Sequence, residues 1–254
     1  MAKDDIPTNL ARPLRLPSAS LANRAARLAT RDHRGKEIQK DSGVLVIGLG
    51  RFGASMALTL DRLGQDVLAV EKNPQLVAHF SDRLPIVEAD ATNPEALEQL
   101  GARDFSVVVV GVGTALEASV LITGNLVDID TPQIWAKAIS AEHGRILQRI
   151  GVHHVVFPEF DAGNRVAHLV SGKLMDYIEV EDGFTIVKMR PPKETQGFTI
   201  AQSKVLEKYG VTIIGVKSPG MDFVYADPDT RISANDLIIA SGHSELLERF
   251  AARP

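Results

Sequence analysis

The chain has 254 residues, of which 44% are apolar and 24% are charged, enough to bury a substantial core and to predict two domains. Its mean hydropathy is +0.01, no apolar run reaches the ~18 residues of a membrane span, and the first ten residues lack the pattern of a secretory signal. Cysteine is absent, which excludes disulfides and thiolate chemistry, and a net charge of −4 gives no general indication of nucleic-acid binding.

Residues 1–42 are expected to form a basic, poorly ordered N-terminal tail. They hold nine Lys or Arg residues against five Asp or Glu residues and include three prolines, a composition that favours disorder. A short helix over residues 20–31 would separate apolar from basic side chains, Leu21, Ala25 and Leu28 against Arg24, Arg27 and Arg31. Two interpretations stay open: a solvated tail that forms a turn or two, or a segment that binds an anionic membrane surface or partner.

A glycine motif follows the first apolar run of the chain. Residues 44–47 are apolar and β-branched, and the G-x-G-x-x-G pattern of Gly48, Gly50 and Gly53 comes next, before a helical pattern over residues 54–63. In a dinucleotide-type site the first glycine permits the turn, the second lets a phosphate approach the backbone, and the third lets the helix pack on the strand. The N-terminus of the helix then faces the anion.

An acidic residue supports the same interpretation. Residues 67–70 are expected to form the second strand, which ends at Glu71, about 20 residues after the motif. A carboxylate at this place can accept hydrogen bonds from both ribose hydroxyls. We therefore predict an adenine nucleotide site, the alternative being a turn of purely structural glycines.

Strands and helices alternate regularly from residue 43 onward. The expected strands are residues 44–47, 67–70, 86–88, 107–110, 134–136 and 154–157, and the expected helices are residues 54–63, 75–82, 94–100, 116–127 and 141–150. Near-continuous apolar strands in such alternation are typical of a parallel sheet covered on both faces. The sequence thus predicts an α/β fold, a Rossmann-like doubly wound domain over residues 43–160.

A small C-terminal α+β domain is expected over residues 179–254. A connecting segment, 161–178, precedes it and is expected to be helical over residues 161–175. The expected strands of the second domain are 184–189, 211–216, 223–225 and 237–240, and the expected helices are 204–208 and 243–251. Proline and glycine supply its turns.

The loops after the parallel strands are the place for a ligand, because ligands of such sheets lie beyond the carboxyl ends of the strands. The candidate residues there, besides the three motif glycines, are Arg51, Phe52, Glu71, Lys72, Asp90, Ala91, Thr92, Gly111, Gly113, Lys137 and Glu159. Arg51 suggests a β- or γ-phosphate, since Arg binds such oxygens bidentately; a surface salt bridge is the alternative, and Lys137 is interpreted in the same two ways. Asp90 and Thr92 can contact adenine or simply cap the helix that begins at Pro94.

No catalytic residue is predicted. The seven histidines have no metal-ligand spacing supported by carboxylates, and neither a G-x-S-x-G nor a Walker motif occurs. The C-terminal domain is small for a substrate domain and offers no acid/base group that stands out. The site is therefore expected to bind a nucleotide rather than consume it, with an NAD-dependent oxidoreductase as the alternative.

Several motifs in order resemble one regulatory family. They are G-L-G-R-F-G-A-S from residue 48, D-A-T at 90–92, I-W-A-K at 134–137, V-F-P-E at 156–159, K-Y-G-V-T-I-I-G-V at 208–216 and D-L-I-I-A-S-G-H at 236–243. These resemble the RCK (KTN) domain and the RCK-C (TrkA-C) domain of TrkA/KtrA-type subunits of bacterial potassium uptake systems. The resemblance covers about residues 43–250.

The resemblance implies a cytoplasmic gating subunit and not an enzyme. Such a subunit binds ATP, ADP or NAD(H), lies at the inner face of the membrane and controls a potassium-translocating partner of the TrkH/KtrB type. It forms homo-oligomers, from a dimer to an octameric ring. Carried over residue by residue, the family roles are phosphate contact for Arg51 and Lys137, ribose for Glu71, adenine for Asp90 and Thr92, and a divalent cation, Mg²⁺ or Ca²⁺, at the nucleotide for Glu159.

Two departures from the family pattern limit this transfer. Related C-terminal domains that bind cyclic di-AMP usually have an Arg shortly before K-Y-G, whereas here Leu206 stands nearest and Lys204 is the only basic residue just upstream. Cyclic di-AMP binding is therefore a separate hypothesis. The basic tail is the second departure, because family members commonly begin close to the first strand.

Overall fold

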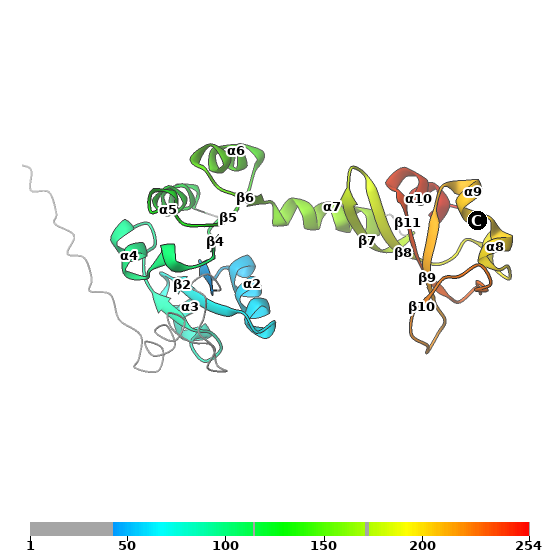
Figure 1. Ribbon diagram of the computed structural model, residues 1–254, viewed down its shortest axis with the longest axis horizontal. Coiled ribbons are helices and arrows are strands. Elements are labelled where there is room, and N and C mark those ends of the chain that lie inside the picture. The colour runs from blue at the N-terminus through cyan, green and yellow to red at the C-terminus, as the bar shows by residue number, and fades with distance from the viewer. Residues whose placement is uncertain (1–42, 114, 171–172, 254) are drawn as a thin grey trace, which may run out of the picture. The chain divides into compact units, whose positions relative to one another are not determined.

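A computed structural model describes residues 43–113, 115–170 and 173–253 (Figure 1). The predicted tail of residues 1–42, with its helix at 20–31, lies outside the described residues. The chain divides between Pro158 and Glu159 into two compact units, here called the N-terminal unit and the C-terminal unit. Within the described residues, no helix combines the length and the apolar character needed to cross a membrane.

Six parallel strands form the sheet of the N-terminal unit. They are β1 (Gly43–Ile47), β2 (Asp66–Glu71), β3 (Ile86–Glu88), β4 (Val107–Val110), β5 (Ile134–Lys137) and β6 (His154–Val156). Their order in the sheet is β3-β2-β1-β4-β5-β6, with every neighbouring pair parallel. The order reverses between β1 and β4, which makes the carboxyl ends of these two strands the topological switch point. The predicted Rossmann-like doubly wound sheet is confirmed.

Helices cover both faces of this sheet. Leu45 and Ile47 of β1 share a core with helices α4 (Pro94–Gln99), α5 (Leu116–Asp128) and α6 (Ala141–Ile150). Val44 and Val46 point the other way and share a second core with α2 (Arg51–Arg62) and α3 (Pro74–Phe80). A short 3₁₀ helix, η1 (Ala102–Asp104), follows α4. Because successive side chains of a strand alternate between faces, an apolar run such as β1 needs cover on both sides.

Helix α2 begins three residues earlier than the sequence pattern suggested. It starts at Arg51, with Gly50 as its N-cap, so Arg51, Phe52 and Gly53 form its first turn rather than a loop. A Cβ atom on Gly53 would overlap the Gly48 carbonyl oxygen. The absence of a side chain at Gly53 therefore lets the helix start directly against the end of β1.

The C-terminal unit is built on an antiparallel sheet. Its strands are β7 (Leu174–Glu181), β8 (Phe184–Met189), β9 (Thr212–Lys217), β10 (Val224–Tyr225) and β11 (Leu237–His243), in the order β10-β9-β11-β8-β7. Its helices are α7 (Pro158–Val170), α8 (Ile200–Ser203), α9 (Val205–Tyr209) and α10 (Ser244–Ala251), with the 3₁₀ helix η2 (Lys193–Thr195). Met189, Ile238 and Phe250 are among the buried residues of its core. The predicted α+β class of this piece is confirmed.

One expectation for this unit was wrong, and one helix was not predicted. The helix expected over residues 161–175 is α7, which begins at Pro158 and ends at Val170, and residues 174–181 form strand β7 instead. Apolar residues stand there at positions 174, 175, 177, 178 and 180, a spacing that fits a strand and a helix alike. The sequence pattern also missed α8, although Thr199 and Gln202 form a capping box at its start, a recognisable signal.

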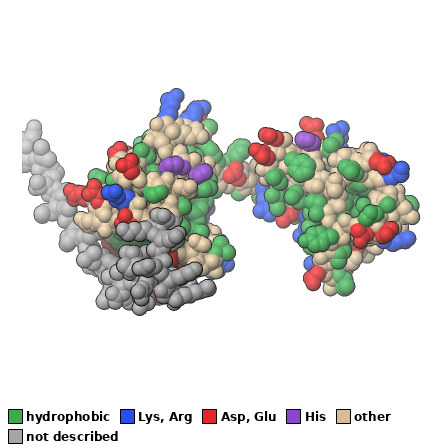
Figure 2. Space-filling model, viewed as in Figure 1, with side chains coloured by type: hydrophobic (Ala, Val, Ile, Leu, Met, Phe, Trp, Pro, Cys, Tyr) green, Lys and Arg blue, Asp and Glu red, His purple; other side chains and the backbone are tan. Residues whose placement is uncertain are grey.

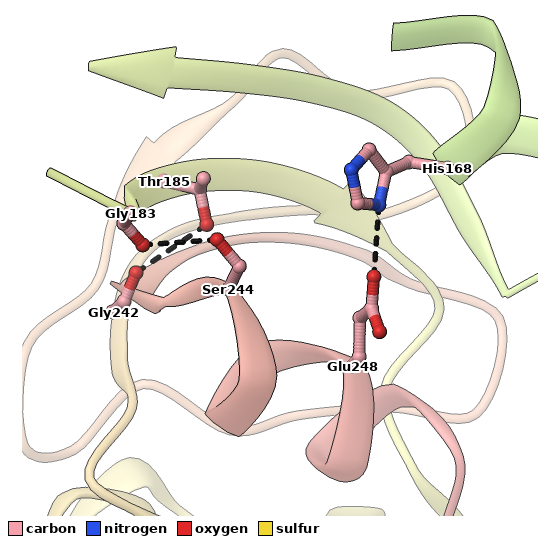
Figure 3. A network of polar contacts seen from close by, with 6 residues as sticks. All are labelled: His168, Gly183, Thr185, Gly242, Ser244 and Glu248. Atoms are coloured by element: carbon pink, nitrogen blue, oxygen red, sulfur yellow. Dashed lines mark hydrogen bonds and ion pairs between the residues drawn. The ribbon is translucent and has the colours of Figure 1, made fainter. Parts of the chain in front are cut away.

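Polar contacts attach α7 and α10 to the sheet of the C-terminal unit (Figure 3). His168 of α7 approaches the Glu248 carboxylate of α10, with Nδ1 and Oε1 2.8 Å apart, and its ring stacks on Tyr177 of β7 at 3.9 Å. At the other end of α10, the Ser244 hydroxyl donates to the Gly183 carbonyl oxygen at 2.9 Å. The helix that opens this unit is thus connected to both β7 and α10.

Candidate functional site

Two glycine-containing loops meet at the switch point of the parallel sheet. One follows β1 and the other, residues 111–113, follows β4. The Gly111 amide donates to the Ile47 carbonyl at 2.8 Å, and a Cβ on Gly111 would lie 3.0 Å from the Gly48 oxygen. Gly48 itself has a φ of +87°, and a Cβ there would lie 2.7 Å from a methyl carbon of Val112. Packing and backbone conformation thus explain these glycines without any ligand.

Gly50 has no such structural explanation. Its φ is −62° and its ψ is −178°, a conformation open to any residue, and a Cβ there would have no described non-neighbouring heavy atom within 4 Å. No side chain of the described residues caps α2, whose first N–H groups lack intrahelical partners, as at any helix start. The N-terminus of α2 is therefore approachable at the place where the motif predicts a phosphate.

Glu71 lies beside this loop and holds it. Its side chain is only 9% exposed; Oε2 accepts a hydrogen bond from the Leu49 amide at 2.7 Å, and Oε1 accepts one from the Asn73 amide at 2.9 Å. A carboxylate oxygen can accept more than one hydrogen bond, so these contacts leave capacity for a ribose hydroxyl. The sequence predicted the carboxylate at this place but not its two backbone partners.

The turn after β3 is organised by Asp90. Its Oδ1 accepts hydrogen bonds from the amide and the hydroxyl of Thr92, at 3.0 and 2.7 Å. Partial burial alone would raise the pKa of the Asp90 carboxyl, but the hydrogen bonds from Thr92 and the charge of Lys72 together hold that pKa below its usual range. The helix that follows is capped by Asn93, whose side chain accepts from the Glu95 amide at 3.0 Å.

A residue that sequence reasoning missed also supports this turn. Asn125 of α5 donates a hydrogen bond from Nδ2 to the Thr92 carbonyl at 3.0 Å. The two residues are 33 positions apart, so no local pattern in the sequence indicates the contact. Ala91, between Asp90 and Thr92, is 4% exposed and fixes the turn against the core. The predicted adenine contact of Asp90 and Thr92 stays a prediction.

Besides Lys72, which directly follows β2, two cationic side chains lie at the carboxyl edge of the sheet. Arg51 is exposed in the first turn of α2 and forms no ion pair with any other described residue. Lys137 ends β5, and its Nζ lies 5.9 Å from the ring centroid of Phe52. Both cations thus belong to elements that end or begin at the edge where the glycine loops meet.

Glu159 follows the last strand of the parallel sheet by three residues. It lies in the first turn of α7 and belongs to the C-terminal unit. Across the described ranges, no group of three or more His, Asp or Glu side chains could hold a metal ion. The predicted role of Glu159 as a cation ligand therefore stays a prediction.

The parallel sheet with its glycine loops and the antiparallel sheet that follows define a class of protein. In this class a Rossmann-type domain precedes a small antiparallel domain. Residues 44–158 match the TrkA-N domain family and residues 186–253 match the TrkA-C domain family. The chain is 35% identical to Ktr system potassium uptake protein A of Bacillus subtilis over 213 residues, covering 83% of this chain and 96% of that protein. It is 32% identical to Ktr system potassium uptake protein C of the same organism, covering 82% and 95%. The chain belongs to the family of TrkA/Ktr potassium uptake proteins, as the resemblance predicted.

Solved structures of low sequence identity show the same fold. The GsuK channel bound to NAD is 16% identical with a TM-score of 0.61, covering 90% of this chain. The GsuK RCK domain is also 16% identical, with a TM-score of 0.58 and 86% coverage. This chain spans 42% and 49% of those two chains. The predicted RCK fold is confirmed.

Proposed function

We propose that this chain is a cytoplasmic regulatory subunit of a potassium uptake system, which binds a nucleotide in its N-terminal unit and controls a membrane subunit of the TrkH/KtrB type that translocates potassium. The observation that carries this proposal is the extent of the similarity to Ktr system potassium uptake protein A, which reaches 96% of that protein's length. Both domains are present, so the similarity is not limited to a nucleotide-binding module that many unrelated proteins share. No observation favours the NAD-dependent oxidoreductase.

The ligand we propose is ATP, ADP or NAD(H). The open approach above Gly50 suits a phosphate, and the Glu71 carboxylate at the end of β2 suits a ribose. Arg51 would bind the outer phosphate oxygens, since a guanidinium matches them bidentately. Lys137 would add a second positive charge, and Asp90 with Thr92 would contact the adenine. The GsuK channel, which shares this fold, binds NAD, and this supports a dinucleotide as one of the ligands.

A divalent cation is a further part of the proposal. Mg²⁺ usually keeps several waters and is bound by one or two carboxylates together with phosphate oxygens. A single acid such as Glu159 therefore suffices if a nucleotide supplies the remaining ligands. We expect Mg²⁺ or Ca²⁺ to tighten ATP binding to the native chain and to have less effect in the Glu159→Gln variant, as titration calorimetry would measure.

Self-association is proposed from the apolar surface of the C-terminal unit. Helix α7 has no buried residue, and Phe160, Val166 and Val170 on it are 74%, 52% and 79% exposed. Met175, Ile178 and Val180 of β7 are also exposed. Apolar side chains likewise gather on the visible face of this unit (Figure 2). Exposed patches of this kind mark association sites, and we propose a homodimer as the minimum unit of a larger ring.

A binding screen tests the nucleotide part of this proposal. A ligand selective for the native state raises the melting temperature by mass action, corresponding to about 2.7 kcal/mol at a hundredfold excess over Kd. We expect ATP, ADP or NADH to raise it and NADPH to raise it much less, because its 2′-phosphate would meet the Glu71 carboxylate. Equal or tighter NADPH binding would contradict the ribose assignment. Cyclic di-AMP in the same screen tests the separate hypothesis for the C-terminal unit.

Reconstitution tests the regulatory part. The chain would be added to vesicles that contain the potassium-translocating partner, and potassium flux would be followed with ATP and with ADP. Such a switch works only through differential affinity for two states, so we expect the two nucleotides to give different fluxes. A flux independent of the chain and of every nucleotide would contradict the regulatory role, whatever the binding screen shows.

A further inference from the structure

Phe52 and Lys137 approach each other across the glycine loops of the N-terminal unit. Phe52 is the second residue of α2, and Lys137 is the last residue of β5. The Lys137 Nζ atom lies 5.9 Å from the centroid of the Phe52 ring, within the ~6 Å over which the negative face of an aromatic ring attracts a cation. Both side chains are half-buried, so the contact is partly shielded from water.

Gly113 fixes the path of the lysine side chain. A Cβ on Gly113 would lie 3.1 Å from Cε and 3.2 Å from Cδ of Lys137, and 3.1 Å from a methyl carbon of Ile139. The lysine chain therefore lies directly against the backbone of the loop after β4, and a larger residue at Gly113 would displace it. The alkyl part of Lys137 contacts the loop of residues 111–113. Its ammonium group lies over the ring of Phe52, which belongs to α2, the helix that follows the other glycine loop.

We propose that Phe52 is a positioning residue, which holds the Lys137 ammonium beside the first turn of α2 for a nucleotide phosphate. This inference rests on the nucleotide site proposed above. The N-terminus of a helix is the positive end of its dipole and does not attract a cation, whereas the face of the Phe52 ring does. An ammonium kept near the start of α2 favours the ligand with the most negative charge. Phe52 would thus influence which nucleotide binds, although its side chain carries no charge.

A positioning role for Phe52 differs from ordinary packing, because its effect must depend on the charge of the ligand and on the presence of Lys137. A packing defect in the first turn of α2 would weaken every nucleotide alike. A displaced ammonium weakens ATP most, ADP less and AMP least. The contribution of a partly exposed cation–π contact corresponds to about two- to fivefold in affinity.

The test is titration calorimetry of ATP, ADP and AMP with the full chain. The variants are Phe52→Leu, which removes the ring, Phe52→Tyr, which keeps it, Lys137→Gln, and the double variant of Phe52→Leu with Lys137→Gln. We expect Phe52→Leu to lower ATP affinity about two- to fivefold, with a smaller loss for AMP, and Phe52→Tyr to retain the native order. In the Lys137→Gln background, Phe52→Leu should cause no further loss.

The outcomes distinguish three situations. An equal loss for all three nucleotides in Phe52→Leu, or a loss that persists without the Lys137 ammonium, would overturn the positioning role. A failure of Phe52→Tyr to retain the preference for ATP would overturn it as well. A native chain that binds NADH but none of the three overturns the inference alone, and one that also fails to bind NADH contradicts the proposed function itself. Melting curves of each variant show whether it is folded before its affinities are compared.

Discussion

The two sheets differ in how completely they bury their strands. In the N-terminal unit, β1 and β2 are buried along their whole length except at the first residue, because helices cover both faces. In the C-terminal unit, β7 buries only Leu174 and Tyr177 of its eight residues, and several of its apolar side chains are exposed. The N-terminal unit leaves the N–H groups at the start of α2 without a side-chain cap, which suits an anionic ligand. The second leaves apolar side chains open, which suits another protein surface.

The substitution with the largest expected effect tests how tightly α2 packs against the glycine loop after β1. A methyl group on Gly53 would overlap the Gly48 carbonyl, so Gly53→Ala should destabilise the chain by about 3 kcal/mol or more. Gly50→Ala is the matched control, since a Cβ there has free space. It should preserve or slightly raise the melting temperature but weaken ATP binding in calorimetry. Two variants of equal stability would mean that Gly53 is not constrained by packing.

A substitution at Arg51 tests whether the start of α2 binds phosphates. Replacing Arg51 with Ala should weaken ATP more than NADH, because a charge-assisted bidentate contact is worth on the order of 1.5–3 kcal/mol, about tenfold to a hundredfold in affinity. The melting temperature without ligand should stay close to that of the native chain, since no described residue pairs with this side chain. Unchanged ATP affinity would return Arg51 to the role of a solvated surface cation.

A substitution at Phe160 tests whether the exposed apolar side chains of the C-terminal unit mediate self-association. Phe160→Glu should weaken self-association at least about tenfold in sedimentation experiments, since burying a phenylalanine contributes about 1.5–3 kcal/mol. Leu63, which is 72% exposed in the N-terminal unit, provides the control, and Leu63→Glu should leave association unchanged. If both variants associate like the native chain, then α7 is not part of the contact.

The smallest expected effect is that of replacing His143, which is buried where helices cover the sheet of the N-terminal unit. His143 is fully buried in the first turn of α6, its Nδ1 accepts from the Ile139 amide at 3.4 Å, and its Nε2 has no partner among the described residues. Burial lowers the pKa of this imidazole, so the unfolded chain binds the proton more readily than the folded one. Stability should then fall as the pH drops through the ordinary histidine range, about 6.5.

The measurement is a series of melting curves between neutral and mildly acidic pH. His143→Gln should remove part of the decline, while the same change at the exposed His154 should keep it. A native decline that is identical in His143→Gln would show that another group is responsible.

Local sequence signals were sufficient for most of the first unit and for less of the second. The parallel strands are short, nearly uniform apolar runs with glycine or Asn-Pro boundaries, and Asn73 and Asn93, each followed by proline, cap the helices that come next. Strand β7 was missed because it is an exposed edge strand, and its mixed spacing carries no clear period. Half-buried antiparallel strands give a reliable signal only when one face is polar throughout.

Within the candidate site, residue types could be predicted but their partners could not. Glycine spacing and the distance to Glu71 follow from a local motif, whereas the contact of Asn125 with Thr92 and that of Phe52 with Lys137 join residues far apart in the chain. Such contacts depend on the order of strands in the sheet, which a single sequence does not specify. The start of α2 was misplaced for a related reason, because the overlap that only glycine avoids at Gly53 is a tertiary constraint.

The two backbone contacts of Glu71 restrict how this protein could be redesigned. Preference for a 2′-phosphorylated dinucleotide is usually pursued by replacing the acid at the end of β2 with a small or basic residue. Here the same carboxylate holds the Leu49 amide of the glycine loop and the Asn73 amide that precedes α3. Its removal would leave two amide donors unsatisfied in a largely buried place, at a cost of about 1–3 kcal/mol each. Any replacement of Glu71 would thus also require a new support for the glycine loop after β1.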